Sequence, residues 1–462
     1  MIQDYFAHRE EIDYPDFRKL IEDVAVRYPD NIAFRMRRPD GRGDEEKKSG
    51  GPLEDFREDS FADTTSVVRR YAGALTGLGL RKGDRLGLIS ENRIEWLQTY
   101  LAAVYAGIVI VPFDIHTSDE GLVRYAGFAD LSGMVYSQKY AVHAGRMVEA
   151  LDNCGVMINL DGPGRENGES RRSRERPRQG NRSPQGELFL AELIASSEEV
   201  EESELEELSP DDPASIIFTS GTTGSPKGVT LSHHGIIANV NASILSLPID
   251  EHDNFVAVLP FHHTYPTTCS FVSPFTVGGS VTIVDRIVGP RIIADIRDTG
   301  GTIIIGVPLL YDKLKKGIDA KLKQLPQPKR AMLKAMRALS RAGAKTGIPP
   351  GRLLFRGLRQ KAGLDSLRLL VSGGGPLAAS TADFFSELGF TIVQGYGMSE
   401  NGPLITTNTE KHCDNRSAGL PVFRTDIRIA DRDEEGVGEI RVTSPSLMLG
   451  YFRNEEATRE SF

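Results

Sequence analysis

The sequence predicts an α/β fold built on mainly parallel sheets. Short runs of β-branched and other apolar residues recur along the chain, and each ends near Gly, Pro or Ser, as buried strands do. Stretches in which apolar residues have helical spacing lie between these runs. Because strands that alternate with helices are typical of parallel sheets, the two observations together favour this fold class.

Seven of the apolar runs are too short for helices, and we interpret them as strands. They are Arg85–Ile89, Ile108–Val111, Ser215–Phe218, Val281–Val284, Thr302–Ile305, Leu367–Val371 and Thr391–Val393. A helix is expected between the first two, because apolar side chains recur there at spacings of three and four. These side chains are Trp96, Leu97, Tyr100, Leu101 and Val104. Trp96, the only tryptophan of the chain, is expected in the core.

Length and composition indicate a globular protein that does not bind nucleic acid. A chain of 462 residues is long enough for more than one packed subdomain. Its 39% hydrophobic and 26% charged residues are ordinary for a soluble protein. The net charge of −9 argues against a nucleic-acid partner, which would be held by neutralisation of its many phosphates.

A cytoplasmic location is expected from the N-terminus and the cysteines. The segment Met1–Glu10 is polar and does not resemble a signal peptide, and no apolar run approaches the ~18 residues that span a bilayer. The three cysteines, Cys154, Cys269 and Cys413, are odd in number and widely spaced. A disulfide framework is therefore not expected, and the cysteines also lack the spacing of a zinc site.

Three polar stretches interrupt the alternating pattern: Arg37–Gly51, Gly162–Gly186 and the acidic Glu198–Glu207. The middle one combines dense charge with almost no apolar residue, so burial cannot offset the entropy of ordering it. We interpret residues 162–186 as a flexible surface insertion. The alternative is that its arginines bind an acidic partner or the anionic inner face of the membrane, where the protein would then be peripheral.

The most informative segment is a loop that follows the predicted strand Ser215–Phe218. Its glycines let backbone N–H groups approach a polyanion, its hydroxyls can bind phosphate oxygens or Mg²⁺, and its lysine is a mobile counter-charge. A Walker A loop is excluded, because Pro226 stands where that motif needs Gly and Gly228 where it needs Ser or Thr. On its own, a Gly-rich surface turn remains the alternative. The loop residues singled out are Thr219, Ser220, Gly221, Thr222, Thr223, Gly224 and Lys227.

The whole string TSGTTGSPKGV, followed by Leu231, Ser232 and His233, resembles the signature loop of the adenylate-forming superfamily. This superfamily comprises acyl-CoA synthetases, adenylation domains and luciferases. The resemblance implies that the loop residues bind ATP, that Lys227 takes part in catalysis, and that the hydroxyl of Thr219 is a partner of Mg²⁺.

A second motif, LPFHHTY at residues 259–265, resembles the Pro-x-x-His element of the superfamily. The resemblance assigns His263 a catalytic position near the acyl and phosphate groups. Without the other motifs, a core or surface histidine would be the better interpretation of His263. We expect the neighbouring His262 to be structural.

A third motif, VSGGGPL at residues 371–377, follows a predicted strand and resembles the superfamily's Ser-Gly-Gly/Ala-Ala-Pro-Leu turn. Its glycines leave room for a flat base to lie against the backbone. Gly375 stands where the superfamily often has Ala, a departure that we expect to be harmless. The residues implied to bind ATP here are Gly373, Gly374, Gly375 and Pro376.

The fourth motif, QGYGMSE at residues 394–400, is also expected to follow a strand and resembles the superfamily's Gly-Tyr-Gly-x-Thr-Glu element. Tyr396 offers an aromatic face to adenine. By the resemblance, Ser399 replaces the usual Thr and bonds the α-phosphate, and Glu400 holds Mg²⁺; both are counted as catalytic. The other residues implied to bind ATP are Gln394, Gly395, Gly397 and Met398.

The resemblance covers most of residues 60–160 and 187–462, and it includes GEIRV at 438–442 and LGYF at 449–452. It implies that residues 1–462 form one large adenylate-forming domain of stacked, mainly parallel sheets flanked by helices. A smaller β-rich subdomain is expected at about 403–462. In the superfamily a Gly-Asp segment, a hinge and a small C-terminal lid domain follow, none of which the sequence contains. We therefore expect ATP binding and slow adenylation, but poor thioester formation.

The implied reaction is the ATP- and Mg²⁺-dependent activation of a small-molecule carboxylic acid, followed by transfer to CoA. The segment ADFFSELGF, the helical region Asp312–Leu364 and VPLLYDKL at 307–314 favour the long-chain fatty-acid branch. Two alternatives stay open: transfer to a carrier-protein thiol, and an idle nucleotide- or acyl-binding domain. The sequence does not predict the oligomeric state.

Overall fold

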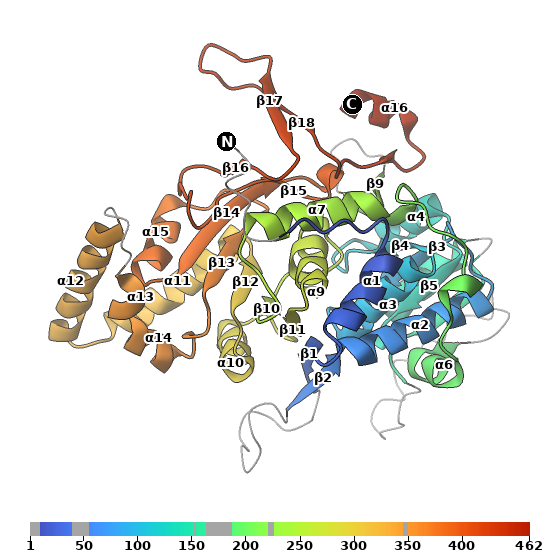
Figure 1. The fold of residues 1–462 in the computed structure, drawn as a ribbon, viewed down its shortest axis with the longest axis horizontal. Helices are drawn as coiled ribbons and strands as arrows, with labels where there is room; N and C mark the ends of the chain where they lie inside the picture. Colours follow the sequence, from blue (N-terminus) through green and yellow to red (C-terminus); the bar gives the residue numbers. More distant parts are fainter. Residues whose placement is uncertain (1–9, 39–54, 152–153, 163–186, 220–225, 345–349) are drawn as a thin grey trace.

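Two large sheets with helices between and around them make up the protein, as a computed structural model shows (Figure 1). The structure describes residues 10–38, 55–151, 154–162, 187–219, 226–344 and 350–462. In these ranges one sheet has nine strands in the order β16-β15-β14-β13-β12-β10-β11-β1-β2. The other has eight strands in the order β19-β9-β8-β4-β3-β5-β6-β7, and β17 and β18 form a separate pair.

The strands are short, as expected for buried strands that alternate with helices. The nine-stranded sheet contains β1 (Ile32–Arg37), β2 (Phe56–Ser60), β10 (Asn254–Ala257), β11 (Ser280–Ile283), β12 (Ile303–Gly306), β13 (Leu369–Ser372), β14 (Thr391–Gly397), β15 (Leu404–Thr407) and β16 (Leu420–Pro421). The eight-stranded sheet contains β3 (Arg85–Ile89), β4 (Val109–Pro112), β5 (Gly133–Tyr136), β6 (Val156–Asn159), β7 (Leu188–Phe189), β8 (Pro213–Thr219), β9 (Lys227–Ser232) and β19 (Gly450–Tyr451). The separate pair is β17 (Asp426–Ala430) and β18 (Glu439–Thr443).

The central pairs of both sheets are parallel, which confirms the predicted fold class. In the nine-stranded sheet β1, β11, β10, β12, β13 and β14 pair in parallel, and only its edges are antiparallel. In the other sheet β8, β4, β3, β5, β6 and β7 pair in parallel. All seven predicted strands are present; β3 has the predicted ends, and the ends of the other six differ from the prediction by at most four residues.

A layer of helices lies between the two sheets and forms a core with both. It consists of α1 (Phe17–Arg27), α2 (Phe61–Gly77), α3 (Ile94–Tyr105), α7 (His233–Ser246) and α9 (Ser273–Thr276). Their apolar side chains share one cluster with Phe34 of β1 and Val229 of β9, which belong to different sheets. Trp96 is 1% exposed and stacks on Tyr100 in this cluster, as predicted.

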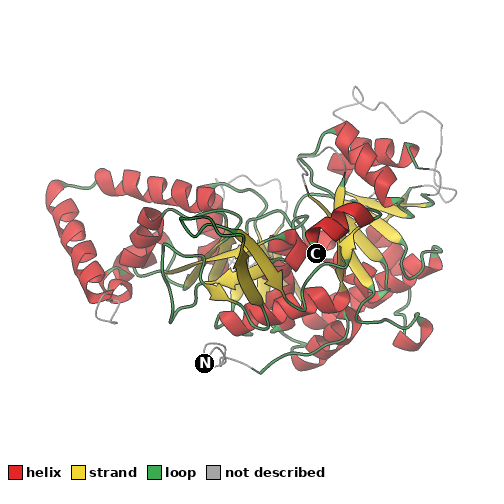
Figure 2. Ribbon diagram, turned by 90° about the horizontal axis from the view of Figure 1, so that it is seen from above, coloured by secondary structure: helices red, strands yellow, loops and turns green. Residues whose placement is uncertain are grey.

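Further helices cover the outer faces of the sheets, so that the whole is layered (Figure 2). The outer face of the nine-stranded sheet is covered by α10 (Gly289–Thr299), α11 (Pro308–Lys323) and α15 (Ala379–Glu387), with α12 (Gln327–Ala344), α13 (Gly351–Leu354) and α14 (Arg356–Ala362) beside them. The eight-stranded sheet is covered by α4 (Asp119–Ala129) and α5 (Ala141–Glu149). The remaining helices are α6 (Leu190–Ser196), α8 (Thr264–Pro266) and α16 (Glu455–Ser461).

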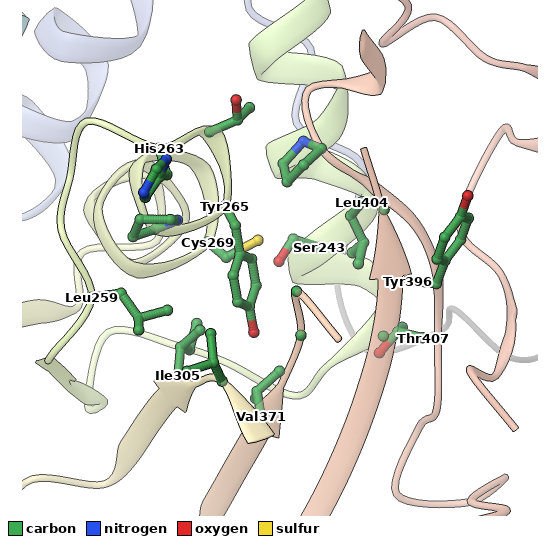
Figure 3. Close-up of a pocket in the computed structure, with 18 of the residues that line it drawn as sticks. Ser243, Leu259, His263, Tyr265, Cys269, Ile305, Val371, Tyr396, Leu404 and Thr407 are labelled. Carbon is green, nitrogen blue, oxygen red and sulfur yellow. The ribbon is translucent and has the colours of Figure 1, made fainter. Parts of the chain in front are cut away.

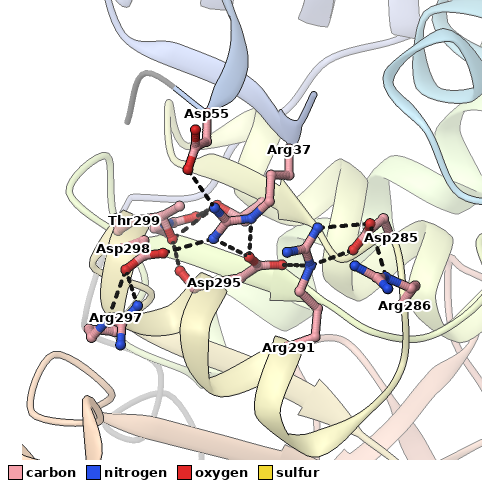
Figure 4. A network of polar contacts seen from close by, with 11 residues as sticks. Arg37, Asp55, Asp285, Arg286, Arg291, Asp295, Arg297, Asp298 and Thr299 are labelled. Atoms are coloured by element: carbon pink, nitrogen blue, oxygen red, sulfur yellow. Dashed lines mark hydrogen bonds and ion pairs between the residues drawn. The ribbon is translucent and has the colours of Figure 1, made fainter. Parts of the chain in front are cut away.

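Buried charges join β1 to α10 (Figure 4). Arg37 at the end of β1 donates to Asp295 at 2.8 Å and to Asp298 at 2.8 Å, and both carboxylates are almost fully buried. Arg291 lies on the other side of Asp295 and pairs with Asp285. Burial raises the pKa of Asp295 although Arg37 and Arg291 oppose this rise. The guanidinium of Arg37 therefore compensates a carboxylate that water does not reach.

The strands after residue 403 are divided among three sheets. β15 and β16 extend the nine-stranded sheet, β19 pairs with β9, and β17 and β18 form the ribbon that projects at the top of Figure 1. This region is rich in strands, as expected. Of the polar stretches, residues 163–186 and 39–51 lie outside the described residues. The acidic stretch packs on the inner helices, where Glu199 pairs with Arg69 and Glu202 with Lys19.

None of the helices in the described ranges combines the length and the apolar character needed to cross a bilayer.

Candidate active site

A cavity of about 460 Å³ opens at the carboxyl ends of the parallel strands β12, β13 and β14 (Figure 3). This edge is the usual position of ligand sites in parallel α/β sheets. The inner helix α7 and the segment 259–269 close the other sides of the cavity. Its lining residues include Ser243, Leu247, Leu259, His263, Tyr265, Cys269, Ile305, Val307, Val371, Gly373, Gly374, Gly395, Tyr396, Gly397, Met398, Ser399, Leu404 and Thr407.

Three of the four sequence motifs meet at this cavity. Eight predicted site residues line it: His263, Gly373, Gly374, Gly395, Tyr396, Gly397, Met398 and Ser399. Six other described site residues are not among its lining residues: Thr219, Lys227, Gly375, Pro376, Gln394 and Glu400. Residues 220–224 of the phosphate loop lie outside the described residues, and only its two ends, Thr219 and Lys227, are described.

The segment 394–397 differs from the prediction that it follows a strand. It is the second half of β14, because Gly395 and Tyr396 pair with Thr407 and Thr406 of β15. The sequence does not predict a strand at 394–397, because small and polar residues alternate there and form no apolar run. Gly397 lies so close to β15 that a Cβ atom would stand 2.2 Å from the carbonyl oxygen of Pro403.

Gln394 braces the site instead of facing the cavity. Its side-chain oxygen accepts from the backbone N–H of Leu377 at 3.3 Å, and its amide donates to the carbonyl oxygen of Ser417 at 2.9 Å. These two hydrogen bonds connect the turn after β13, at Leu377, to the segment before β16, at Ser417. We therefore interpret Gln394 as a residue that positions the glycine turn.

The glycines of the turn after β13 have different neighbours. A Cβ atom on Gly373 would lie 2.7 Å from the ring of Tyr265, whereas one on Gly375 would lie 3.7 Å from Pro308, an ordinary contact. Gly374 has φ +73°, which side chains disfavour. The space at Gly375 agrees with the prediction that Ala or Gly is harmless at this position.

The segment that carries His263 is held by contacts with the inner helix layer. The side chain of Asn92 donates to the carbonyl oxygen of Leu259 at 2.7 Å and accepts from the N–H of Phe261 at 3.0 Å. The ring of Phe261 packs against Trp96 in the central core. The motif is therefore fixed on both sides of residue 260.

His263 is neutral at pH 7. The wall of the cavity shields the His263 ring from part of the solvent, and this partial desolvation and the neighbouring His262 lower the pKa of His263 to about 4. His262 is buried, as expected for a structural residue, and its Nε2 lies 3.2 Å from Asp114 Oδ1. The proximity of His262 holds the pKa of Asp114 well below its ordinary value, so this carboxyl is ionised.

Most of the described cavity wall is apolar, but two hydroxyls in it, those of Tyr265 and Thr264, lack a partner among the described residues. The oxygen of Tyr265 is buried and has no hydrogen bond among the described residues. Figure 3 shows this side chain pointing between Ile305 and Val371, which are apolar. A ligand group or a water in the cavity is the available partner for this hydroxyl.

A tyrosine that sequence reasoning did not single out connects two predicted catalytic residues. The hydroxyl of Tyr451 donates to Glu400 Oε1 at 2.7 Å, and the ammonium of Lys227 lies 5.1 Å from the centre of the Tyr451 ring. Burial and the bond to Glu400 raise the pKa of Tyr451 to about 12, so it stays a donor. The contact depends on the pairing of β19 with β9, for which the local sequence carries no signal.

Thr219 belongs to the same group of residues. It pairs with Lys227 across β8 and β9, and the turn Ser399–Asn401 contacts β9. A carboxylate and a threonine hydroxyl are hard oxygen donors of the kind that Mg²⁺ prefers. Glu400 and Thr219 therefore fit the predicted Mg²⁺ site in chemistry.

Comparison with known proteins identifies a family over most of the chain. The model of a family described as AMP-binding enzyme matches residues 21–452. A long-chain-fatty-acid–CoA ligase of Mycobacterium bovis is 28% identical over 421 residues, an alignment that covers 87% of this chain and 65% of the relative. A feruloyl-CoA synthase of an Amycolatopsis species is 25% identical over 408 residues, an alignment that covers 87% of this chain and 68% of the relative. The chain thus spans only part of the length of these relatives.

The fold has a counterpart among solved structures. The N-terminal domain of FACL13 from Mycobacterium tuberculosis has a TM-score of 0.70 and 20% identity, covering 97% of this chain and 94% of that chain. This likeness confirms the predicted architecture of two stacked, mainly parallel sheets.

Proposed function

Because the chain belongs to the AMP-binding enzyme family, we propose that it activates a carboxylic acid with ATP, forming an acyl-adenylate. The observation that carries the proposal is the cavity at the ends of β12, β13 and β14, where three motifs meet beside Glu400, Tyr451 and Lys227. In this reaction a carboxylate oxygen attacks the α-phosphorus of ATP, and the bond to pyrophosphate breaks. No general base is needed, because the acid is already ionised at neutral pH.

The charges of the triphosphate decide which residues matter most. Lys227 and the loop 219–224 are proposed to hold the phosphates, and Ser399 to donate to the α-phosphate. Glu400 and Thr219 would hold Mg²⁺, which when bound offsets negative charge on the phosphates. Positioning of this kind contributes more to such a transfer than acid–base chemistry does. The neutral ring of His263 can orient the acyl group.

The apolar wall supports a substrate with an apolar chain, and we propose a medium- or long-chain fatty acid that is then transferred to CoA. An acid that carries a polar group is the second candidate, since the hydroxyl of Tyr265 has no partner in the described part of the cavity. An apolar chain would leave that hydroxyl unpaired at a cost of about 1–3 kcal/mol. A carrier-protein thiol remains the alternative acceptor, and an idle binding domain the alternative to an enzyme.

Exchange of pyrophosphate into ATP tests the adenylation step without a thiol. The 462-residue chain is assayed with fatty acids, aryl acids, hydroxy acids and amino acids. We expect exchange with fatty acids; preference for aryl or hydroxy acids would support the second candidate, and exchange only with amino acids would contradict the fatty-acid proposal. Exchange with none of them would favour the idle domain.

A matched pair of variants distinguishes the site from general effects. Lys227→Met is expected to lower exchange about 100-fold, because it removes a charge at the phosphates. Lys139→Met is the control, since the ammonium of Lys139 also lies over a tyrosine ring, that of Tyr140 at 5.2 Å, but outside the site. An equal loss in both variants would count against the role of Lys227.

A further inference from the structure

We propose that Asp114, His262 and His263 together bind one divalent transition-metal ion, such as Zn²⁺, at the wall of the cavity. Their possible ligand atoms all lie within 4.8 Å of one another, and no other such group of three occurs in the described parts of the chain. The site joins the two sheets, because Asp114 follows β4 and the histidines follow β10.

One pair of ligand atoms lies close to the spacing that an ion requires. Nε2 of His262 lies 3.2 Å from Oδ1 of Asp114. An ion with four ligands at about 2.0–2.2 Å separates neighbouring ligand atoms by roughly 3.3 Å. The same pair does not have the geometry of a directed hydrogen bond, so Nε2 is a buried nitrogen that lacks such a partner among the described residues.

Both members of this pair are held in place from outside the site. His262 is 4% exposed and follows the segment that Asn92 fixes at Leu259 and Phe261. Oδ1 of Asp114 accepts from the backbone N–H of His116 at 2.8 Å. Because these two ligands are already ordered, less side-chain conformational entropy is lost when an ion binds.

His263 supplies the third ligand. Its ring centre lies 4.3 Å from that of His262, and its side chain is exposed at the cavity. Two imidazoles and one carboxylate suit Zn²⁺, Co²⁺ or Ni²⁺, whereas Mg²⁺ prefers oxygen ligands alone. Three protein ligands also leave a fourth position open. The site is therefore chemically distinct from the oxygen donors of Glu400 and Thr219.

An ion in this position would fix His263 at the cavity wall. The proposal concerns binding alone, so it does not depend on the proposed reaction. It holds or fails in the absence of ATP and of any acid.

The test is titration of the metal-free 462-residue chain with Co²⁺ in excess Mg²⁺. We expect one Co²⁺ per chain with the intense visible absorption of four-coordinate cobalt, and displacement of that absorption by Zn²⁺. His263→Ala is the decisive variant, because the side chain is exposed and its loss leaves the core unchanged. It should weaken Co²⁺ binding at least about 10-fold, as loss of a ligand does. Asp114→Asn is expected to act in the same direction.

A matched control is available on the outer surface. His143 Nε2 also lies 3.2 Å from an aspartate oxygen, Oδ1 of Asp119, but this pair is exposed and belongs to no group of three in the described structure. His143→Ala should leave Co²⁺ binding unchanged. The proposal is overturned if the wild-type chain takes up no Co²⁺ in excess Mg²⁺, or if His263→Ala and His143→Ala bind it equally to wild type.

Discussion

At the scale of single residues, the glycine turn after β13 shows how closely the cavity wall is packed. Gly373 faces the ring of Tyr265 at a distance that leaves no room for a methyl group, whereas a methyl group on Gly375 would make only an ordinary contact with Pro308. The same substitution is therefore expected to be costly at Gly373 and harmless at Gly375, which gives a test within one turn.

Gly373→Ala is expected to destabilise the protein by about 1–3 kcal/mol, because the new methyl group displaces Tyr265. Ligand binding in the cavity should weaken as the ring moves. Gly375→Ala should change neither property measurably. Urea unfolding and a binding titration with ATP measure both variants. Equal losses of stability in the two would contradict the claim that only Gly373 lacks room for a methyl group.

Tyr451 contacts two predicted catalytic residues, Glu400 and Lys227. Tyr451→Phe keeps the ring under Lys227 and removes the hydroxyl that orients the Glu400 carboxylate. Since such orienting bonds typically contribute 10- to 100-fold to metal affinity, the Mg²⁺ concentration for half-maximal exchange should rise about 10-fold. The apparent KM for the acid should stay constant.

Tyr136→Phe is the control for this substitution. Tyr136 also donates to a glutamate, Glu187 at 2.8 Å, but on the eight-stranded sheet away from the cavity. A rise in the Mg²⁺ requirement of both variants, or of neither, would contradict the proposal that the Tyr451 hydroxyl orients Glu400.

At the scale of elements, β1 is attached to α10 by the buried charges of Figure 4. Arg37→Met should destabilise the fold by about 3 kcal/mol, because Asp295 is left buried with one weaker partner. Adding Asp295→Asn to this variant should restore part of the loss. Arg441→Met is the control, since Arg441 is exposed on the ribbon β17–β18 and pairs only with exposed acids. Chemical denaturation measures all three; no recovery in the double variant would contradict the charge argument.

Helix α7 begins with a histidine whose charge state affects stability. Burial lowers the pKa of His233 to about 4 from an ordinary value of 6.5, and its Nδ1 accepts from the N–H of Phe17 at 3.3 Å. The folded protein thus binds fewer protons than the unfolded chain between these values. The contribution of His233 is present above pH 6.5 and is lost as the pH falls towards 4.

This argument predicts a loss of about 2 kcal/mol from His233 between pH 7 and pH 5. His233→Gln, which cannot be protonated, should flatten the fall in the free energy of unfolding over this range by that amount. Unfolding curves at several pH values measure the slope. An unchanged slope would show that other groups, such as His263, account for the acid sensitivity.

At the scale of the whole molecule, the two sheets do not have separate inner cores. One cluster of apolar side chains includes residues from both sheets and from the five helices between them. The only tryptophan, Trp96, lies in that cluster. We therefore expect the two sheets to unfold together. Fluorescence of Trp96 and far-ultraviolet circular dichroism should give the same midpoint in urea, and clearly separated midpoints would contradict a shared core.

Much of the architecture could be predicted from local patterns. The seven strands, the helix that carries Trp96 and the α/β class follow from the spacing of apolar residues, since burial on both faces requires continuous apolar runs. The second half of β14 was missed, because Gly395 and Tyr396 are held in a strand by pairing with β15 and not by their own propensity. Propensity is a weak guide where tertiary pairing decides the structure.

The site was predicted in part. The motifs identified His263, Tyr396 and Ser399 as neighbours of one ligand, and all three line the cavity. The bracing role of Gln394 and the contact of Tyr451 with Glu400 were not foreseen. Both depend on bonds between segments that are far apart in the chain.

The sequence by itself determined the family and the fold class, because motif strings and apolar runs reside in short stretches of adjacent residues. Only the tertiary structure decided that Tyr451 meets Glu400 and Lys227, that Asp114 meets the two histidines, and that the sheets share a core. The physical reason is that local residue patterns encode backbone conformation and burial. Which distant side chains come into contact depends on the order of the strands and on the packing of the helices between them.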